Sequence, residues 1–213
     1  MKFNIKSILL FIWNNFIWLA VLLFVVDLVS KQIVLNTMTV GQSIPLIGNF
    51  LEIEYVINDG AAFGIQFKDA LINQIIWIIV SLLGSVILIG VFVKKHNKMN
   101  KYVIASLMLM ISGCLGNLID RAFYSSEYLN YSTNGVVDFI GVNFGSWPFP
   151  RFNVADSCLV IGTIMLIIWL FISEAQELRK SKKVEETKTN EKILSKDEIE
   201  MNERANPNKD DAK

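Results

Sequence analysis

Four aspartates near the ends of long apolar segments are the residues of this chain best suited to chemistry. They are Asp27, Asp120, Asp138 and Asp156. Ionisable side chains at a bilayer are costly, which makes them candidates for function. When two carboxyl groups share a site of low dielectric constant, one stays protonated while the other is ionised. Such a pair can activate water against a peptide carbonyl without a covalent intermediate.

The spacing of the surrounding polar residues places them on shared helix faces. Asp27 and Lys31 are four residues apart, so they can pair. Residues three or four apart also share a face in two other groups, namely Asn117, Asp120 and Arg121, and Asn153 and Asp156. A cationic neighbour holds a carboxylate ionised, which suits an ion pair better than acid–base work. Asp138 and Asp156 lack such a neighbour in sequence, which favours them as the working pair, although folding could still bring a cation close.

Other catalytic arrangements find little support. The single histidine, His96, lies in a basic segment, so neither a Ser-His-Asp triad nor an HExxH zinc site can be built. Ser30 and Lys31 are adjacent on a helix and point about 100° apart, which is poor geometry for mutual activation. Cys114 and Cys158 lie within apolar segments and are expected to be packing residues.

Four apolar blocks must position these side chains. The chain is 53% hydrophobic with a mean hydropathy of +0.43, and each block is about as long as a helix that crosses a hydrocarbon core of roughly 30 Å. The blocks are Ile8–Val26, Ala70–Val93, Tyr102–Leu118 and Val154–Ser173. Because they show no polar face, a soluble helical bundle is disfavoured. We expect the first block to be a retained helix, since no small-residue cleavage site follows it.

Lysine and arginine concentrate before the first block, between the second and third, and after the fourth. This distribution predicts cytoplasmic termini and two external segments. The fold class expected is therefore an all-α membrane protein of four transmembrane helices with a small β-rich extracytoplasmic module.

The two external segments differ in character. Residues 33–68 carry turn residues and an alternating apolar pattern over 50–57, which predicts the β-rich module. Residues 122–152 are rich in aromatic residues and contain Pro148 and Pro150 near their end. The residue before a proline is biased to extended geometry, so the fourth helix should begin after Pro150. There Arg151 is expected to contact lipid headgroups, and Asn153 could cap the fourth helix. We divide the chain into a membrane domain of residues 1–173 and a charged tail of 174–213, expected to be disordered or a frayed helix in the cytoplasm.

Five short motifs, in order, resemble those of the lipoprotein signal peptidase family (signal peptidase II), an aspartyl peptidase family, across residues 8–173. The motifs are Asp27–Lys31 (D-x-x-x-K), Asn58–Phe63 (N-x-G-A-A-F), Gly116–Arg121 (G-N-x-x-D-R), Val136–Phe139 (V-V-D-F) and Phe152–Ser157 (F-N-x-A-D-S). Each motif alone is weak, but five in this order are specific. The stretch between Arg121 and Gly135, which contains Tyr124, Tyr128 and Tyr131, is longer than is usual in the family.

The resemblance implies roles for individual residues. Asp138 and Asp156 would be the catalytic pair, in agreement with the argument from neighbouring charges. Residues expected to line the site and hold the substrate are Asn58, Asn117, Arg121 and Asn153, and the expected supporting residues are Asp27, Lys31 and Asp120.

The resemblance also implies a substrate and a location. The substrate would be a prolipoprotein carrying diacylglycerol on its cysteine, cut just before that cysteine at the outer face of the bacterial inner membrane. No metal, cofactor or nucleic acid is expected, whereas membrane lipid and globomycin-type cyclic peptide inhibitors are expected partners. Two other classes remain open: a small transporter, which would place its acids at mid-span, and a non-catalytic membrane scaffold, which would not need aligned acids and amides.

Overall fold

The computed structural model describes residues 4–60, 69–129 and 134–205. Its chain divides into two compact units, Met1–Leu166 and Ile167–Lys213, with the division inside the last helix. The first unit contains all the candidate site residues. The second consists of helix up to residue 205.

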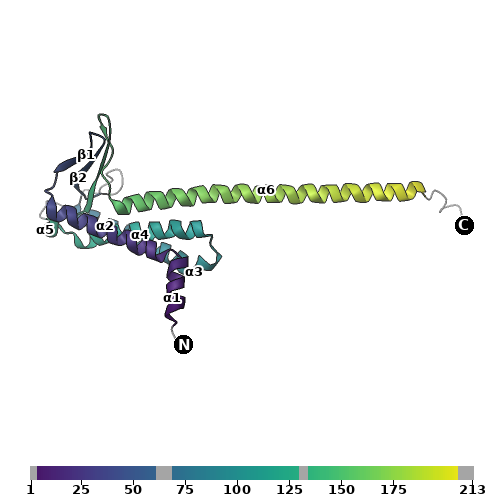
Figure 1. The fold of residues 1–213 in the computed structure, drawn as a ribbon, viewed down its shortest axis with the longest axis horizontal. Helices are drawn as coiled ribbons and strands as arrows, with labels where there is room; N and C mark the ends of the chain where they lie inside the picture. Colours follow the sequence, from purple (N-terminus) through teal and green to yellow (C-terminus); the bar gives the residue numbers. More distant parts are fainter. Residues whose placement is uncertain (1–3, 61–68, 130–133, 206–213) are drawn as a thin grey trace. The chain divides into compact units, whose positions relative to one another are not determined.

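Within the described residues, four helices are long and apolar enough to cross a membrane, as predicted. They are α2 (Ile17–Thr37), α3 (Ala70–Lys95), α4 (Lys101–Phe123) and the apolar part of α6 (Val154–Ala205). The remaining helices in the described ranges are short: α1 (Ile5–Asn14), η2 (His96–Lys98) and α5 (Ser126–Leu129). Helix α4 packs against both α2 and α3 (Figure 1), and it is the most buried of the four.

The first apolar block is interrupted, which corrects the predicted bounds of the first span. Helix α1 ends at Asn14, and the backbone N–H and side-chain amide of Asn15 both donate to the carbonyl of Phe11. Phe16 then adopts a left-handed conformation with φ of 54°, and α2 begins at Ile17. Amide side chains that bind the local backbone favour such breaks. The candidate span therefore runs to Thr37, so Asp27 lies well inside α2 and not at its end.

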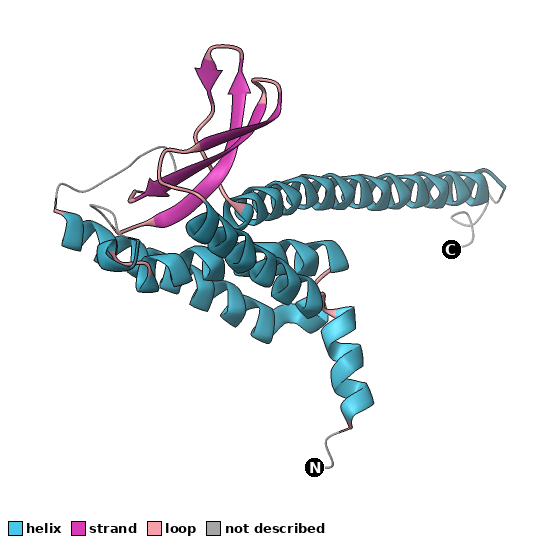
Figure 2. Cartoon of the chain, turned by 60° about the vertical axis from the view of Figure 1, so that its left-hand side comes forward, coloured by secondary structure: helices cyan, strands magenta, loops and turns pink. Residues whose placement is uncertain are grey.

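The sheet recruits strands from both segments between helices, whereas we predicted strands only in residues 33–68. Its strands are β1 (Ser43–Ile47), β2 (Leu51–Asn58), β3 (Val136–Phe144) and β4 (Trp147–Pro148). They form one antiparallel sheet in the order β1-β2-β3-β4 (magenta in Figure 2). Residues 33–37, at the start of the predicted module, belong to α2 instead.

A small apolar core holds this sheet to the helices. It combines residues from α2, β2, β3 and the segment around α5: Val34, Tyr55, Ile57, Tyr124, Leu129, Val137 and Phe139. The side chain of Val137 is fully buried. Because strand residues alternate between faces, burying Val137 and Phe139 turns Asp138 to the opposite face of β3. The core thereby fixes the direction in which the acid points.

Arg151 pairs with the sheet, which differs from the predicted headgroup contact. Its guanidinium lies 2.6 Å from Glu52 Oε1 and 2.5 Å from Glu54 Oε2, and it also donates to Asn143 Oδ1 at 3.0 Å. The side chain is only 15% exposed. Two carboxylates on β2 satisfy the guanidinium, so Arg151 joins the segment before α6 to the sheet.

Helix α6 begins at Val154, after Pro150 as predicted, and continues to Ala205. The charged segment from 174 to 205 is therefore helical, where we expected disorder or a frayed helix. Glutamate, lysine, arginine and leucine are good helix formers. Adding residues to an existing helix avoids the cost of nucleation, so these residues can continue α6 beyond its apolar part.

Candidate active site

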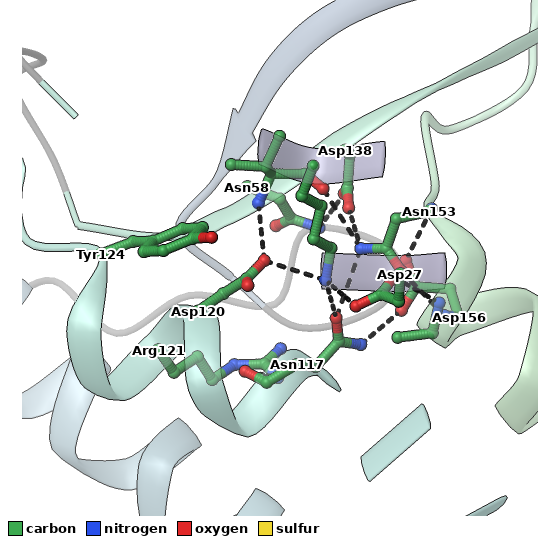
Figure 3. Close-up of polar contacts among 12 residues, drawn as sticks. Asp27, Asn58, Asn117, Asp120, Arg121, Tyr124, Asp138, Asn153 and Asp156 are labelled. Carbon is green, nitrogen blue, oxygen red and sulfur yellow. Dashed lines mark hydrogen bonds and ion pairs between the residues drawn. The ribbon is translucent and has the colours of Figure 1, made fainter. Parts of the chain in front are cut away.

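The predicted site residues converge where the second half of α2, the ends of α4 and β2 and the start of β3 approach the start of α6 (Figure 3). Direct hydrogen bonds or ion pairs link them into one network: Asp27, Lys31, Asn58, Asn117, Asp120, Arg121, Asp138, Asn153 and Asp156. Residues far apart in sequence thus form a single polar cluster.

Asp138 is held on β3 by two amide donors. Strand register places Val56 opposite Asp138 and Asn58 opposite Val136, so the end of β2 lies beside the acid. Asn58 Nδ2 donates to Asp138 Oδ2 at 2.9 Å, and Asn153 Nδ2 donates to Oδ1 at 2.7 Å. The Asp138 side chain is 1% exposed. Its position is therefore fixed and nearly sealed from solvent.

Asp156 lies in the first turn of α6 and takes part in the cap of that helix. Asn153 Oδ1 accepts the backbone N–H of Asp156 at 2.8 Å, and Asp156 Oδ2 accepts that of Asn153 at 3.2 Å. This reciprocal arrangement is a capping box, and it confirms the predicted cap. Asn117 Nδ2 donates to the other carboxylate oxygen, Oδ1, at 2.7 Å. Asp156 is partly exposed, so one of the two acids can reach solvent or substrate.

Burial, and after it the charge of the nearby Asp156 carboxylate, raise the pKa of the Asp138 carboxyl to about 8. Hydrogen bonds from Asn58 and Asn153 and the charge of Lys31 act in the opposite direction but are outweighed. At neutral pH Asp138 therefore keeps a proton that it can donate. Two carboxyl groups in different environments provide an acid and a base.

Lys31 forms the ion pairs that the other two aspartates require. Its Nζ lies 2.8 Å from Asp27 Oδ2, which confirms the predicted pair, and 2.9 Å from Asp120 Oδ2. It also donates to Asn117 Oδ1 at 3.2 Å. The sequence suggested Arg121 as the partner of Asp120, but Lys31 takes that place. In the part of the chain that the structure describes, Lys31 pairs with these two aspartates, and no ion pair reaches Asp138 or Asp156.

Arg121 lies at the edge of the cluster. It donates to Ser81 Oγ at 3.1 Å and to the carbonyl of Asn117 at 3.4 Å. Gln74 donates to the backbone carbonyl of Arg121 at 3.1 Å. Sequence reasoning missed Gln74 and Ser81. Their seven-residue spacing within an apolar block would have placed them on one helix face.

The structure describes only part of one predicted motif, Asn58–Phe63, and only part of the long stretch after α4. Asn58 Oδ1 accepts the N–H of Gly60 at 3.1 Å, so Asn58 serves both a turn and the site. Residues 61–63 of that motif lie outside the described residues, as does Tyr131. Tyr124 stacks on Tyr128 with ring centroids 5.1 Å apart.

Among the described residues, no three His, Cys, Asp or Glu side chains are grouped as ligands for a metal ion. The carboxylates of the cluster face Lys31, side-chain amides and backbone N–H groups instead. Chemically, the arrangement offers a protonated carboxyl, a second carboxylate and several amide donors.

The chain is similar to known proteins over most of its length. The model of a family described as Signal peptidase (SPase) II matches residues 19–172. A lipoprotein signal peptidase of Staphylococcus haemolyticus is 38% identical over 152 residues, covering 71% of this chain and 87% of the relative. One of Clostridium acetobutylicum is 37% identical over 150 residues, covering 70% and 88%.

Two solved structures are also similar. Both are described as a bacterial membrane enzyme determined by the in meso method, one at 2.3 Å and one at 1.9 Å resolution. The first gives a TM-score of 0.63 at 35% identity, covering 74% of this chain and 88% of that one. The second gives 0.60 at 36% identity, covering 72% and 90%.

Proposed function

Because the chain belongs to the signal peptidase II family and is therefore a peptidase, we propose that it removes signal peptides from lipoprotein precursors by an intramembrane aspartyl mechanism. The substrate is a prolipoprotein whose cysteine carries diacylglycerol, and the cut falls just before that cysteine. Asp138 and Asp156 are the catalytic pair. Asn58, Asn117, Arg121 and Asn153 line the site and hold the substrate backbone.

One observation carries this proposal: a single residue joins the two acids. Asn153 donates through its side chain to Asp138 at 2.7 Å and through its backbone to Asp156 at 3.2 Å. The side chain and the backbone of one residue therefore hold the two carboxyl groups in a single site. An acid–base pair acting on one water and one carbonyl requires such a fixed arrangement.

In the proposed mechanism, the two carboxyl groups share one proton. The ionised carboxylate takes a proton from a water molecule, whose oxygen attacks the carbonyl carbon of the scissile peptide bond. The protonated carboxyl polarises the carbonyl oxygen, and a proton then passes to the leaving amine as the C–N bond breaks. The deeper burial of Asp138 and the pKa of about 8 of its carboxyl favour it as the protonated member. The pair still titrates as a unit.

The distribution of lysine and arginine supports a topology for this reaction. We infer that both termini are cytoplasmic and that the sheet and active site lie at the outer face of the bacterial inner membrane. The substrate then enters laterally, with its acyl chains left in lipid. Residues 1–173 form the peptidase domain and 174–213 a cytoplasmic extension. A globomycin-type cyclic peptide is the inhibitor expected for this activity.

Cleavage of a diacylglyceryl-modified prolipoprotein by the detergent-purified protein tests the proposal. We expect the wild type to cleave, and Asp138→Asn and Asp156→Asn to be folded but inactive. Glu54→Gln is a matched control because it also converts a carboxylate to an amide, on β2 outside the cluster, and it should remain active. If the folded wild type does not cleave this prolipoprotein, the protein would be better explained as a transporter or a non-catalytic scaffold. If one Asp→Asn variant keeps near-normal activity, the assigned pair is wrong.

A further inference from the structure

The start of α6 is fixed by an acid from α2 as well as by its own cap. Asp27 Oδ1 accepts the backbone N–H of Ala155 at 2.8 Å. Ala155 immediately precedes Asp156, so this bond holds the backbone directly before one acid of the pair. The carboxylate can approach because Gly116 has no side chain: a Cβ there would lie 2.5 Å from Asp27 Oδ2. Bonds from a carboxylate to a helix N–H are among the stronger protein hydrogen bonds.

Strand β3 is fixed in the same way by an acid from α4. Asp120 Oδ2 accepts the backbone N–H of Val137 at 3.2 Å, and Asn153 Nδ2 lies 3.3 Å from the carbonyl of Val137. Val137 immediately precedes Asp138. Each acid of the pair therefore follows a residue whose N–H is bound by an aspartate from another element.

Lys31 joins the two holding aspartates. Its ammonium carries three protons, and three acceptors face it: Asp27 Oδ2 at 2.8 Å, Asp120 Oδ2 at 2.9 Å and Asn117 Oδ1 at 3.2 Å. The side chains of Lys31 and of the two aspartates are at most 1% exposed. Water therefore cannot readily replace any of these contacts, and a shift of one aspartate is transmitted through the ammonium to the other.

We propose that Asp27, Lys31 and Asp120 form a brace that sets the separation of Asp138 and Asp156. This inference rests on the proposed function, because it takes those two acids as the catalytic pair. The members of the brace are positioning residues and exchange no proton with the substrate. Their effect runs through the backbone of Ala155 to one acid and through the backbone of Val137 to the other.

A displaced acid changes both the rate and its pH dependence. A misplacement of about 1 Å at a catalytic group can cost on the order of 100-fold in rate. The electrostatic interaction between two carboxyl groups also weakens as they separate, which brings their two titration steps closer together. A residue that merely stabilises the fold would lower the amount of active protein and leave this pH profile unchanged.

The test compares Asp27→Asn and Asp120→Asn with the control Glu54→Gln. In Asp27→Asn the amide N–H₂ must face either the ammonium of Lys31 or the N–H of Ala155, because the two oxygens of Asp27 accept from these two donors. In Asp120→Asn the amide oxygen can keep both contacts of Oδ2, but the negative charge that holds Lys31 is lost. Cleavage of the diacylglyceryl-modified prolipoprotein is measured from about pH 5 to 9, and kcat is expressed per folded molecule. Relative to the wild type, we expect kcat to fall about 10- to 100-fold and KM to stay within about twofold. The bell-shaped dependence of kcat on pH should become narrower. The control should stay within about twofold of the wild type.

A second pair of variants covers the case in which an amide variant does not fold. Asp27→Glu and Asp120→Glu keep the charge that Lys31 requires but lengthen the side chain by one methylene, so they should fold and still show reduced kcat with a narrowed profile.

Two results would overturn the brace: kcat within about twofold of wild type in folded variants, or a lower kcat with a profile of unchanged width. If Asp138→Asn and Asp156→Asn are inactive in the same assay, the proposed function stands even though the brace fails. If those two variants retain activity, the proposed function itself fails.

Discussion

The proton held by Asp138 should make the stability of the protein depend on pH in a way that Asp138→Asn removes. In the folded protein the pKa of this carboxyl is about 8, while an unfolded chain gives about 3.9. Between these values the folded state binds a proton that the unfolded state has lost. Stability contributed by a group with a raised pKa is fully present below the unfolded value and is lost as pH rises toward the folded value.

The magnitude follows from the slope of this linkage. With one more proton bound in the folded state, the free energy of unfolding falls by about 1.4 kcal/mol for each pH unit. From pH 5 to pH 7 the wild type should therefore lose about 2.7 kcal/mol relative to Asp138→Asn, which does not titrate. For a chain of this size, that corresponds to roughly 5–10 °C in melting temperature.

The assay is thermal unfolding of both proteins in the same detergent at pH 5 and pH 7. Any constant effect of the amide cancels when the two pH values are compared. Asp156→Asn is a matched variant, since it keeps Asp138 but removes the second cause of the raised pKa. Its pH dependence should lie between those of the other two proteins, because burial is the larger cause. The reasoning would be refuted if the difference in melting temperature between the wild type and Asp138→Asn were equal at both pH values.

Three further substitutions test individual contacts. Asn58→Leu removes a donor that favours ionised Asp138, so the alkaline limb of the pH–activity profile should move up by roughly 1–2 pH units; an unmoved limb would contradict this role. Gly116→Ala puts a Cβ against the carboxylate of Asp27 and should lower the free energy of unfolding by about 1–3 kcal/mol, measured by thermal unfolding; unchanged stability would mean that the helices separate without cost. Arg151→Met leaves two carboxylates of β2 without their cation, so it should lose about 1–2 kcal/mol in the same measurement, and an equally stable variant would make the ion pairs dispensable.

Contacts within one helix were predictable from the sequence. The pair of Asp27 and Lys31 and the cap formed by Asn153 and Asp156 both appear as their spacing indicates. Helix geometry alone determines which side chains share a face. The five motifs likewise identified residues that the structure brings together.

Contacts between elements could not be derived from spacing. Asp120 stands next to Arg121 in sequence, yet its cation is Lys31, on another helix. Asn58 and Asp138 are 80 residues apart and meet because β2 and β3 pair. That pairing depends on which apolar residues the core buries, and the aromatic stretch 122–152 did not indicate a strand partner for β2. The break at Phe16 was missed because Asn14 and Asn15, which precede it, are flanked by apolar residues on both sides.

The pairing of β2 with β3 has a consequence for how the enzyme comes into being during synthesis. The helical hairpin α3–α4 separates the two strands in the chain, so β2 leaves the ribosome long before its partner. Asp138 cannot meet Asn58, nor can Asp156 meet Asn117, until that hairpin has been inserted and the fourth span has followed. Under the proposed function, the nascent chain therefore has no complete active site until its last membrane helix arrives.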